Sequence, residues 1–264
     1  MTSHQRSGSR WSSRAWTCHF GVEVTRRLTL IRNATVLLEL EGQRFLVDPM
    51  LDEAGARPPV ENTENDCRNP LVPLPLPVEE IVAGVDAVLV THLHRDHFDD
   101  GAVRHLPRDL PLYCQPEDEE RLRSYGFEAR PVRDSVVHGS LRISRTGGQH
   151  GHGATAGELG PVSGFVVDGV YIAGDTVWCD QVEQAVAEHR PRVAVVNGSA
   201  ARFIDSEPLV MTTSDIAAVG RLVPTMIVVH LEAINHCLDT RDDVRRALPN
   251  AVVPEDGETV ELPT

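Results

Sequence analysis

The chain reads Thr91-His92-Leu93-His94-Arg95-Asp96-His97 directly after the apolar run 85–90. This segment places three imidazoles and one carboxylate within six residues. An apolar run that ends in such a cluster is typical of a buried strand with polar side chains at its C-terminal edge. Divalent ions such as zinc prefer imidazole and carboxylate ligands, and three buried histidines without a partner are costly. The segment therefore predicts a metal site.

The spacing within the segment indicates two neighbouring metal positions. His92 and His94 are two residues apart, so they face the same side of an extended segment. Asp96 and His97 follow after the chain begins to turn, so they point toward an adjacent position. One short loop can thus supply ligands to two adjacent metals, the arrangement used in two-metal hydrolysis. The pattern HxHxDH after a strand resembles the signature of the metallo-β-lactamase superfamily, and the resemblance spans residues 28–248.

The resemblance implies further ligands at the ends of later strands. In the glycine-rich stretch 147–153, His150 occupies the position of the family's third histidine for the first metal, and His152 is the alternative. Another apolar strand ends in Gly-Asp-Thr (174–176), which resembles the family element whose aspartate bridges both metals. Asp175 is therefore the expected bridging ligand, and the alternative is that it caps the next helix.

The last expected ligand is His230, which ends the β-branched run 225–230, with His236 as the alternative. The resemblance implies two divalent ions, the first held by His92, His94 and His150, the second by Asp96, His97 and His230, with Asp175 between them. We expect zinc, although manganese and iron suit the same side chains.

The predicted elements indicate an α/β fold. The expected strands are 28–40, 43–47, 85–90, 111–114, 140–145, 163–167, 170–173, 192–196 and 225–230, and the expected helices are 99–105, 116–125, 178–189, 214–222 and 241–248. This order fits the αββα sandwich of the family, with two mixed sheets and helices outside. Residues 1–24 are rich in Ser and Arg without an apolar core, so we expect a disordered leader and one hydrolase domain over residues 25–264.

Two further features follow the second expected strand. Asp48 belongs to a Val-Asp-Pro sequence that resembles the family's early aspartate motif. It is expected to orient a metal-binding histidine, or else to form a turn before proline. The irregular stretch 52–77 is dense in proline and polar residues, and it is expected either to cover the metal cleft or to be a solvated insertion.

The composition of the chain disfavours several classes of function. The formal net charge of −14 disfavours a general nucleic-acid binder, and no apolar stretch approaches the length of a membrane span. All 25 basic residues are arginine, which rules out a lysine nucleophile. The five cysteines are scattered without a CxxC pair, as expected for reduced thiols in a cytoplasm. We expect a small-molecule substrate, and the sequence carries no signal for an oligomeric state.

The resemblance implies hydrolysis by a hydroxide that bridges two metals. Asp96 is expected to orient this nucleophile, and His236 is a candidate proton or oxyanion donor. Within the superfamily, the Val47-Asp48-Pro49 element and the Gly-Asp-Thr-Val-Trp stretch look most like those of bacterial metal-dependent hydrolases related to L-ascorbate-6-phosphate lactonase, which implies opening of a lactone or other cyclic ester. The alternatives are a phosphodiesterase acting on a small phosphodiester and a metal-retaining binding or sensory module without turnover.

Overall fold

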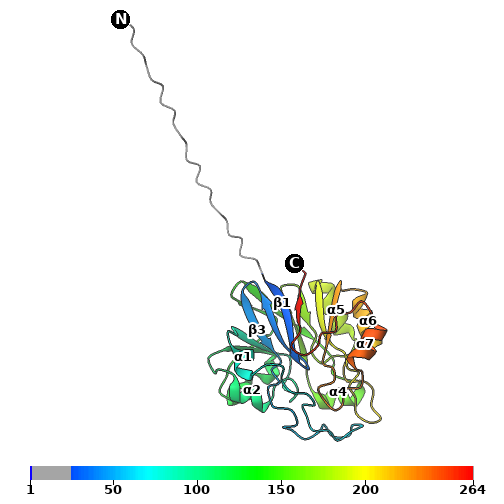
Figure 1. Cartoon of the computed structure of the whole chain (residues 1–264). Coiled ribbons are helices and arrows are strands. Elements are labelled where there is room, and N and C mark those ends of the chain that lie inside the picture. The colour runs from blue at the N-terminus through cyan, green and yellow to red at the C-terminus, as the bar shows by residue number, and fades with distance from the viewer. Residues whose placement is uncertain (2–24, 264) are drawn as a thin grey trace.

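The computed structural model describes Met1 and residues 25–263 of the chain. The predicted leader, apart from Met1, lies outside the described residues. The described strands form two sheets that pack face to face (Figure 1). In spatial order the first sheet contains β13 (Thr259–Glu261), β1 (Arg26–Arg32), β2 (Thr35–Leu40), β3 (Gln43–Val47), β4 (Ala87–Val90), β5 (Pro111–Cys114) and β6 (Glu128–Pro131). The second contains β12 (Thr225–Val229), β11 (Val193–Asn197), β10 (Val170–Ile172), β9 (Ser163–Val167), β8 (Leu141–Gly147) and β7 (Ser135–His138).

Both sheets are mixed. Strands β13, β1, β2 and β3 pair antiparallel and β3 to β6 parallel, whereas β7 to β10 pair antiparallel and β10 to β12 parallel. Parallel neighbours end at the same edge of a sheet, so the segments that follow β4, β10 and β12 can meet there.

Helices cover the outer faces of both sheets (Figure 1). The first sheet carries α1 (Val78–Val82), α2 (Asp100–His105) and α3 (Glu119–Ser124), which share an apolar cluster with it. The second carries α5 (Asp180–His189), α6 (Thr213–Gly220) and α7 (Arg241–Ala247), with a cluster of its own. A third cluster, which includes Phe45, Leu89, Phe165 and Val195, fills the space between the sheets. This is the αββα sandwich that the sequence predicts.

The main difference from the predicted elements lies at the start of the domain. The single strand expected over residues 28–40 is two antiparallel strands, β1 and β2, joined by a turn at Asn33 and Ala34. Asn33 has a left-handed backbone with φ of 56°, which asparagine tolerates better than most residues. Apolar residues continue on both sides of this turn, so the pattern did not reveal it.

Several short elements were not predicted. They are α1, β6, β7, β13 and α4 (Gly153–Leu159), together with the 3₁₀ turn Pro116–Asp118 at the start of the helix expected over residues 116–125. Each is too short to show a clear period. Thr212 and Thr240 cap α6 and α7, and both side chains form capping boxes with the third helical residue. None of the described helices is long and apolar enough to span a membrane.

Candidate metal centre

The side chains predicted as metal ligands lie together at one edge of the two sheets. The loop after β4 supplies four of them, and the segments after β8, β10 and β12 supply one each. They form two groups, and in each group one ligand atom per residue lies within 4.8 Å of the others. The first group contains His92, His94 and His150, and the second contains Asp96, His97, Asp175 and His230.

Asp175 lies between the two groups, and its two carboxylate oxygens face different sides. Oδ2 is 3.4 Å from Nε2 of His150 and 4.0 Å from Nε2 of His92. Oδ1 is 3.1 Å from Nε2 of His97 and 3.6 Å from Nε2 of His230. A carboxylate in this position can touch an ion in either group, which is the place predicted for a bridging ligand.

The two alternative histidines lie outside both groups. His152 precedes α4 as its N-cap residue and is partly exposed. His236 is buried, and the centre of its ring lies 6.3 Å from that of His230. The geometry thus supports His150 and His230 as members of the ligand groups, while the assignment of these side chains to metal ions stays a prediction.

The residues fit divalent ions. The Nε2 atom of His92 is buried and has no hydrogen-bond partner, although buried polar atoms are normally satisfied. The other ring nitrogen of most of these histidines is already engaged: Nδ1 of His97 lies 2.8 Å from Oδ2 of Asp48, and Nδ1 of His150 lies 2.9 Å from a backbone carbonyl oxygen. Such bonds orient an imidazole so that its free nitrogen faces a metal.

The ionisation of the site also suits a metal. Burial lowers the pKa of His92 well below its usual value, and His97 and His94 lower it further. Burial raises the pKa of Asp175, but His97 and His230 outweigh this effect and hold that pKa well below its usual value. The pKa of Asp96 is depressed in the same way. The carboxylates are therefore ionised and His92 is neutral, as metal ligands must be. His97 and His230 differ, because burial lowers the pKa of each but facing groups, Asp175 above all, raise it to about 10 for His97 and well above its usual value for His230. A metal that binds these two rings would displace a proton from each.

Asp48 lies behind the second group, as the sequence predicts. Its carboxylate is 1% exposed and accepts hydrogen bonds from the backbone N–H of Thr91 and the hydroxyl of Thr91, both at 2.7 Å, as well as from Nδ1 of His97. The backbone of Asp48 is left-handed, with φ of 43°. The residue thus fixes the start of the HxHxDH loop and the orientation of one imidazole.

Sequence reasoning missed several supporting groups. Asn197 donates from Nδ2 to Oδ1 of Asp175 at 2.6 Å, and its position at the end of the apolar strand β11 was a usable signal. Ser199 lies two residues further on, and its Oγ is 3.2 Å from Nδ1 of His230. The carbonyl oxygen of Leu209 holds His150, and that of Leu159 lies 3.1 Å from Nε2 of His94. Backbone carbonyls leave no trace in a residue pattern.

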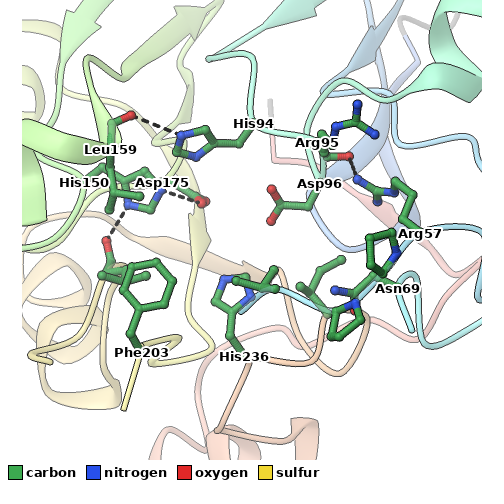
Figure 2. Close-up of a pocket in the computed structure, with 15 residues that line it drawn as sticks. Arg57, Asn69, His94, Arg95, Asp96, His150, Leu159, Asp175, Phe203 and His236 are labelled. Atoms are coloured by element: carbon green, nitrogen blue, oxygen red, sulfur yellow. Dashed lines mark hydrogen bonds and ion pairs between the residues drawn. The ribbon is translucent and has the colours of Figure 1, made fainter. Parts of the chain in front are cut away.

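A cavity of about 560 Å³ opens onto both ligand groups (Figure 2). His94, Asp96, His150, Asp175 and His236 contribute polar groups to its lining, and the polar residues Arg57, Asn69 and Arg95 also line it. Most of the remaining wall is apolar and consists of Pro58, Pro59, Val60, Leu159, Phe203, Leu209 and Ile234. The irregular stretch 52–77 supplies the first three of these residues, and it therefore forms one wall of the cleft.

Buried polar side chains hold this wall in place. The guanidinium of Arg32 is fully buried and donates to the carbonyl oxygens of Val72, Met50 and Asp52 at 2.7 to 2.9 Å. The side chain of Asn235, next to His236 in the sequence, accepts from the N–H of Val60 and donates back to its carbonyl. The wall is thus tied to the sheet and to the segment that carries His236.

Comparisons with known proteins identify the family. The sequence pattern of the Beta-lactamase superfamily domain matches residues 43–232, and the chain belongs to this family. It is 39% identical to the UPF0173 protein YddR of Bacillus subtilis over 250 residues, which are 88% of this chain and 98% of that protein. It is also 26% identical, over 75% of its length and 94% of the relative, to the UPF0173 metal-dependent hydrolase MJ1163 of Methanocaldococcus jannaschii.

Solved structures agree with this assignment. A metal-dependent hydrolase from Veillonella parvula, described as possible, superposes with a TM-score of 0.87 and 33% identity, over 90% of this chain and all of the other. An isothiocyanate hydrolase from Delia radicum gut bacteria superposes with a TM-score of 0.84 and 37% identity, over 89% of this chain and 99% of the other. The chain is therefore a metal-dependent hydrolase of the metallo-β-lactamase fold. The narrower resemblance to ascorbate-6-phosphate lactonase stays a prediction.

Proposed function

We propose that this chain uses two divalent ions, most simply zinc, to hydrolyse a small uncharged molecule that has an electrophilic carbon and an apolar substituent. The observation that carries the proposal is the composition of the cavity, in which apolar side chains surround the two ligand groups. An isothiocyanate is the first candidate substrate, because the isothiocyanate hydrolase from Delia radicum gut bacteria is 37% identical to this chain over 89% of its length. A lactone or other cyclic ester is the second.

The protein's own residues have distinct roles in this reaction. His92, His94 and His150 would hold one ion, while Asp96, His97 and His230 would hold the other, with Asp175 shared. Two such ions supply a water nucleophile with a pKa near neutrality and stabilise developing negative charge. The ionised carboxylate of Asp96 lines the cavity, so it can accept a hydrogen bond from the attacking water and orient it.

His236 is suited to stabilise the negative charge that develops on the substrate during the reaction. Its imidazole lies at the cavity wall beside Asp96 (Figure 2). Burial lowers the pKa of His236 to about 4, so the ring is neutral near pH 7. A neutral imidazole donates one hydrogen bond to a developing anion but is a poor proton donor. We therefore favour the anion-stabilising role of His236 over the role of a general acid.

The cavity wall supports an uncharged substrate. Pro58, Pro59 and Val60 line one side, and Phe203 and Leu209 contribute further apolar surface. Burying an apolar substituent there contributes about 25 cal/mol per Å² of surface removed from water. Such a pocket suits the alkyl or arylalkyl group of an isothiocyanate. Water adds to the central carbon, the carbon–nitrogen bond then breaks, and the products are an amine and carbonyl sulfide.

The two arginines of the lining give little support to a phosphodiester. The guanidinium of Arg57 is 3.4 Å from the carboxylate of Asp52 and donates to the carbonyl oxygen of Arg95. The side chain of Arg95 is 66% exposed and lies 3.3 Å from Asp100. Both cations thus have a partner away from the ligand groups, although Nη2 of Arg57 is buried without a hydrogen-bond partner. The net charge of −14 disfavours nucleic acid as the substrate.

Two observations support the lactone as a second candidate. The sequence Gly174-Asp175-Thr176-Val177-Trp178 and the early Asp48 motif resemble those of lactonase relatives. A lactone is also uncharged, and its acyl carbon undergoes the same attack by water, with the alkoxide as leaving group. Both candidates therefore require the same ligand groups and differ only in what the apolar wall must accommodate.

The experiment is a substrate panel with the purified protein loaded with zinc or manganese. The panel contains 2-phenylethyl isothiocyanate, an alkyl γ-lactone and bis(4-nitrophenyl) phosphate, and the controls are chelator-treated protein and the Asp175→Asn variant. We expect metal-dependent turnover of the isothiocyanate and loss of that turnover in both controls. Turnover of the lactone alone would replace the first candidate with the second. Turnover of the phosphodiester alone would refute the argument from the apolar wall, and no turnover with any metal would favour a binding module.

A further inference from the structure

Asn33 occupies an unusual place in the fold. It lies in the turn between β1 and β2, where its backbone is left-handed, and the residue is only 1% exposed. Turn residues are normally at the surface, since they carry polar backbone groups that need water. Asn33 instead lies inside the protein, where its polar groups need protein partners.

Those partners are residues of the second ligand group. Nδ2 of Asn33 donates to the backbone carbonyl oxygen of Asp96 at 3.1 Å. The backbone carbonyl oxygen of Asn33 accepts from the N–H of His230 at 2.9 Å. Asp96 follows β4 in the first sheet, and His230 follows β12 in the second. One turn residue therefore joins two ligands that come from opposite sheets.

The contacts form a closed loop. Oδ2 of Asp96 is 3.1 Å from Nε2 of His230, so the two side chains contact each other directly. Asn33 joins the backbones of the same two residues. His230 also has a left-handed backbone, with φ of 66°, which is strained for a residue with a side chain of this size. The bond from its N–H to Asn33 helps to hold that conformation.

We propose that Asn33 is a positioning residue for the second metal ion, because it sets the distance between Asp96 and His230. This inference rests on the two-metal site of the proposed function. Oδ1 of Asn33 is buried without a partner, so the carbonyl of Asp96 alone decides which way the amide points. The described contacts of Asn33 include no member of the first group, His92, His94 and His150. The affinity for the first ion is therefore independent of this side chain.

The variant Asn33→Asp tests the amide. It keeps the size of the side chain and the preference for a left-handed backbone, but it replaces the N–H donor with an oxygen that faces the carbonyl of Asp96. The variant Asn33→Gly tolerates the left-handed backbone and removes the side chain entirely. The matched control is Glu41→Gly, because Glu41 has φ of 50° in the exposed turn between β2 and β3, far from the ligand groups.

The experiment is a zinc titration of metal-free full-length protein against a chromophoric chelator, with the thermal midpoint of each variant measured alongside. Residues that support a metal ligand typically change affinity 10- to 100-fold. We expect Asn33→Asp to lower the affinity for the second ion by that factor, and we expect Asn33→Gly to lower this affinity as well. Affinity for the first ion should stay within twofold, and Glu41→Gly should bind both ions as the wild type does.

Three outcomes would overturn the proposal, and they are distinguishable. If the wild type binds two ions and both Asn33 variants bind them equally well, the positioning role is wrong and the two-metal site stands. If the Asn33 variants lose affinity for both ions equally and their thermal midpoint falls, Asn33 serves only the stability of the turn. If the wild type binds a single ion, the two-metal premise of the proposed function fails, and the inference fails with it.

Discussion

Replacing Asp48 with asparagine removes one negative charge from behind the second ligand group without changing the size of the side chain. In the native protein its carboxylate accepts three hydrogen bonds, two from Thr91 and one from Nδ1 of His97. The asparagine oxygen can still accept from the N–H of Thr91. Its NH₂ group then faces the remaining two donors. The hydroxyl of Thr91 can turn and accept, but Nδ1 of His97 must keep its proton when Nε2 holds a metal.

The magnitude follows from the bond that is lost. A hydrogen bond to a charged group contributes about 1.5–3 kcal/mol, which corresponds to a factor of roughly 10 to 150 in a binding constant. We expect Asp48→Asn to lower the affinity for the second ion by this factor and to lower turnover at limiting metal to the same degree. The affinity for the first ion should change less, because Asp48 reaches the predicted ligands of that ion only through the hydroxyl of Thr91, which is 3.1 Å from Nδ1 of His92.

The assay is a competition between the protein and a chromophoric chelator for zinc, followed by elemental analysis of dialysed samples. Asp99→Asn is the matched control. Asp99 is 2% exposed and accepts from the backbone N–H groups of Leu51, Asp52 and Ala102, but none of its described hydrogen bonds reaches a predicted ligand. Asp99→Asn should lower stability and leave metal affinity unchanged. Wild-type affinity for both ions in Asp48→Asn, or an equal loss in the two variants, would refute the reasoning.

Three further predictions concern the ligand groups. Asp175→Asn places an NH₂ group toward one of the two ion positions, so the metal content should fall from two equivalents to one or fewer by elemental analysis; two retained equivalents would remove this residue from the bridge. His150→Ala should lose the first ion, whereas His152→Ala should keep both ions in the same measurement, and the reverse result would exchange their roles. In the metal-free site, burial lowers the pKa of His97 but the facing carboxylates, Asp175 above all, raise it to about 10. Because a metal must displace this proton, the metal affinity should rise by up to about tenfold per pH unit between pH 7 and 10. Calorimetry in two buffers should detect the released proton as a buffer-dependent heat.

The sequence was sufficient to predict the fold class because the HxHxDH segment directly follows an apolar run, and several later strands also end in a histidine or an aspartate. Strands with such ends are local patterns, and they are visible in a single chain. The turn at Asn33 was not visible, because apolar residues surround it on both sides.

The sequence by itself thus determined which residue types reach the metal centre and from which strand ends they come. Only the tertiary structure decided how they are arranged: that Asp175 turns one oxygen to each group, that Asn33 joins Asp96 to His230, and that residues 58–60 form an apolar wall. These are contacts between segments far apart in the chain. They arise when two sheets pack and bring several loops to one edge, and no local period or spacing encodes that packing.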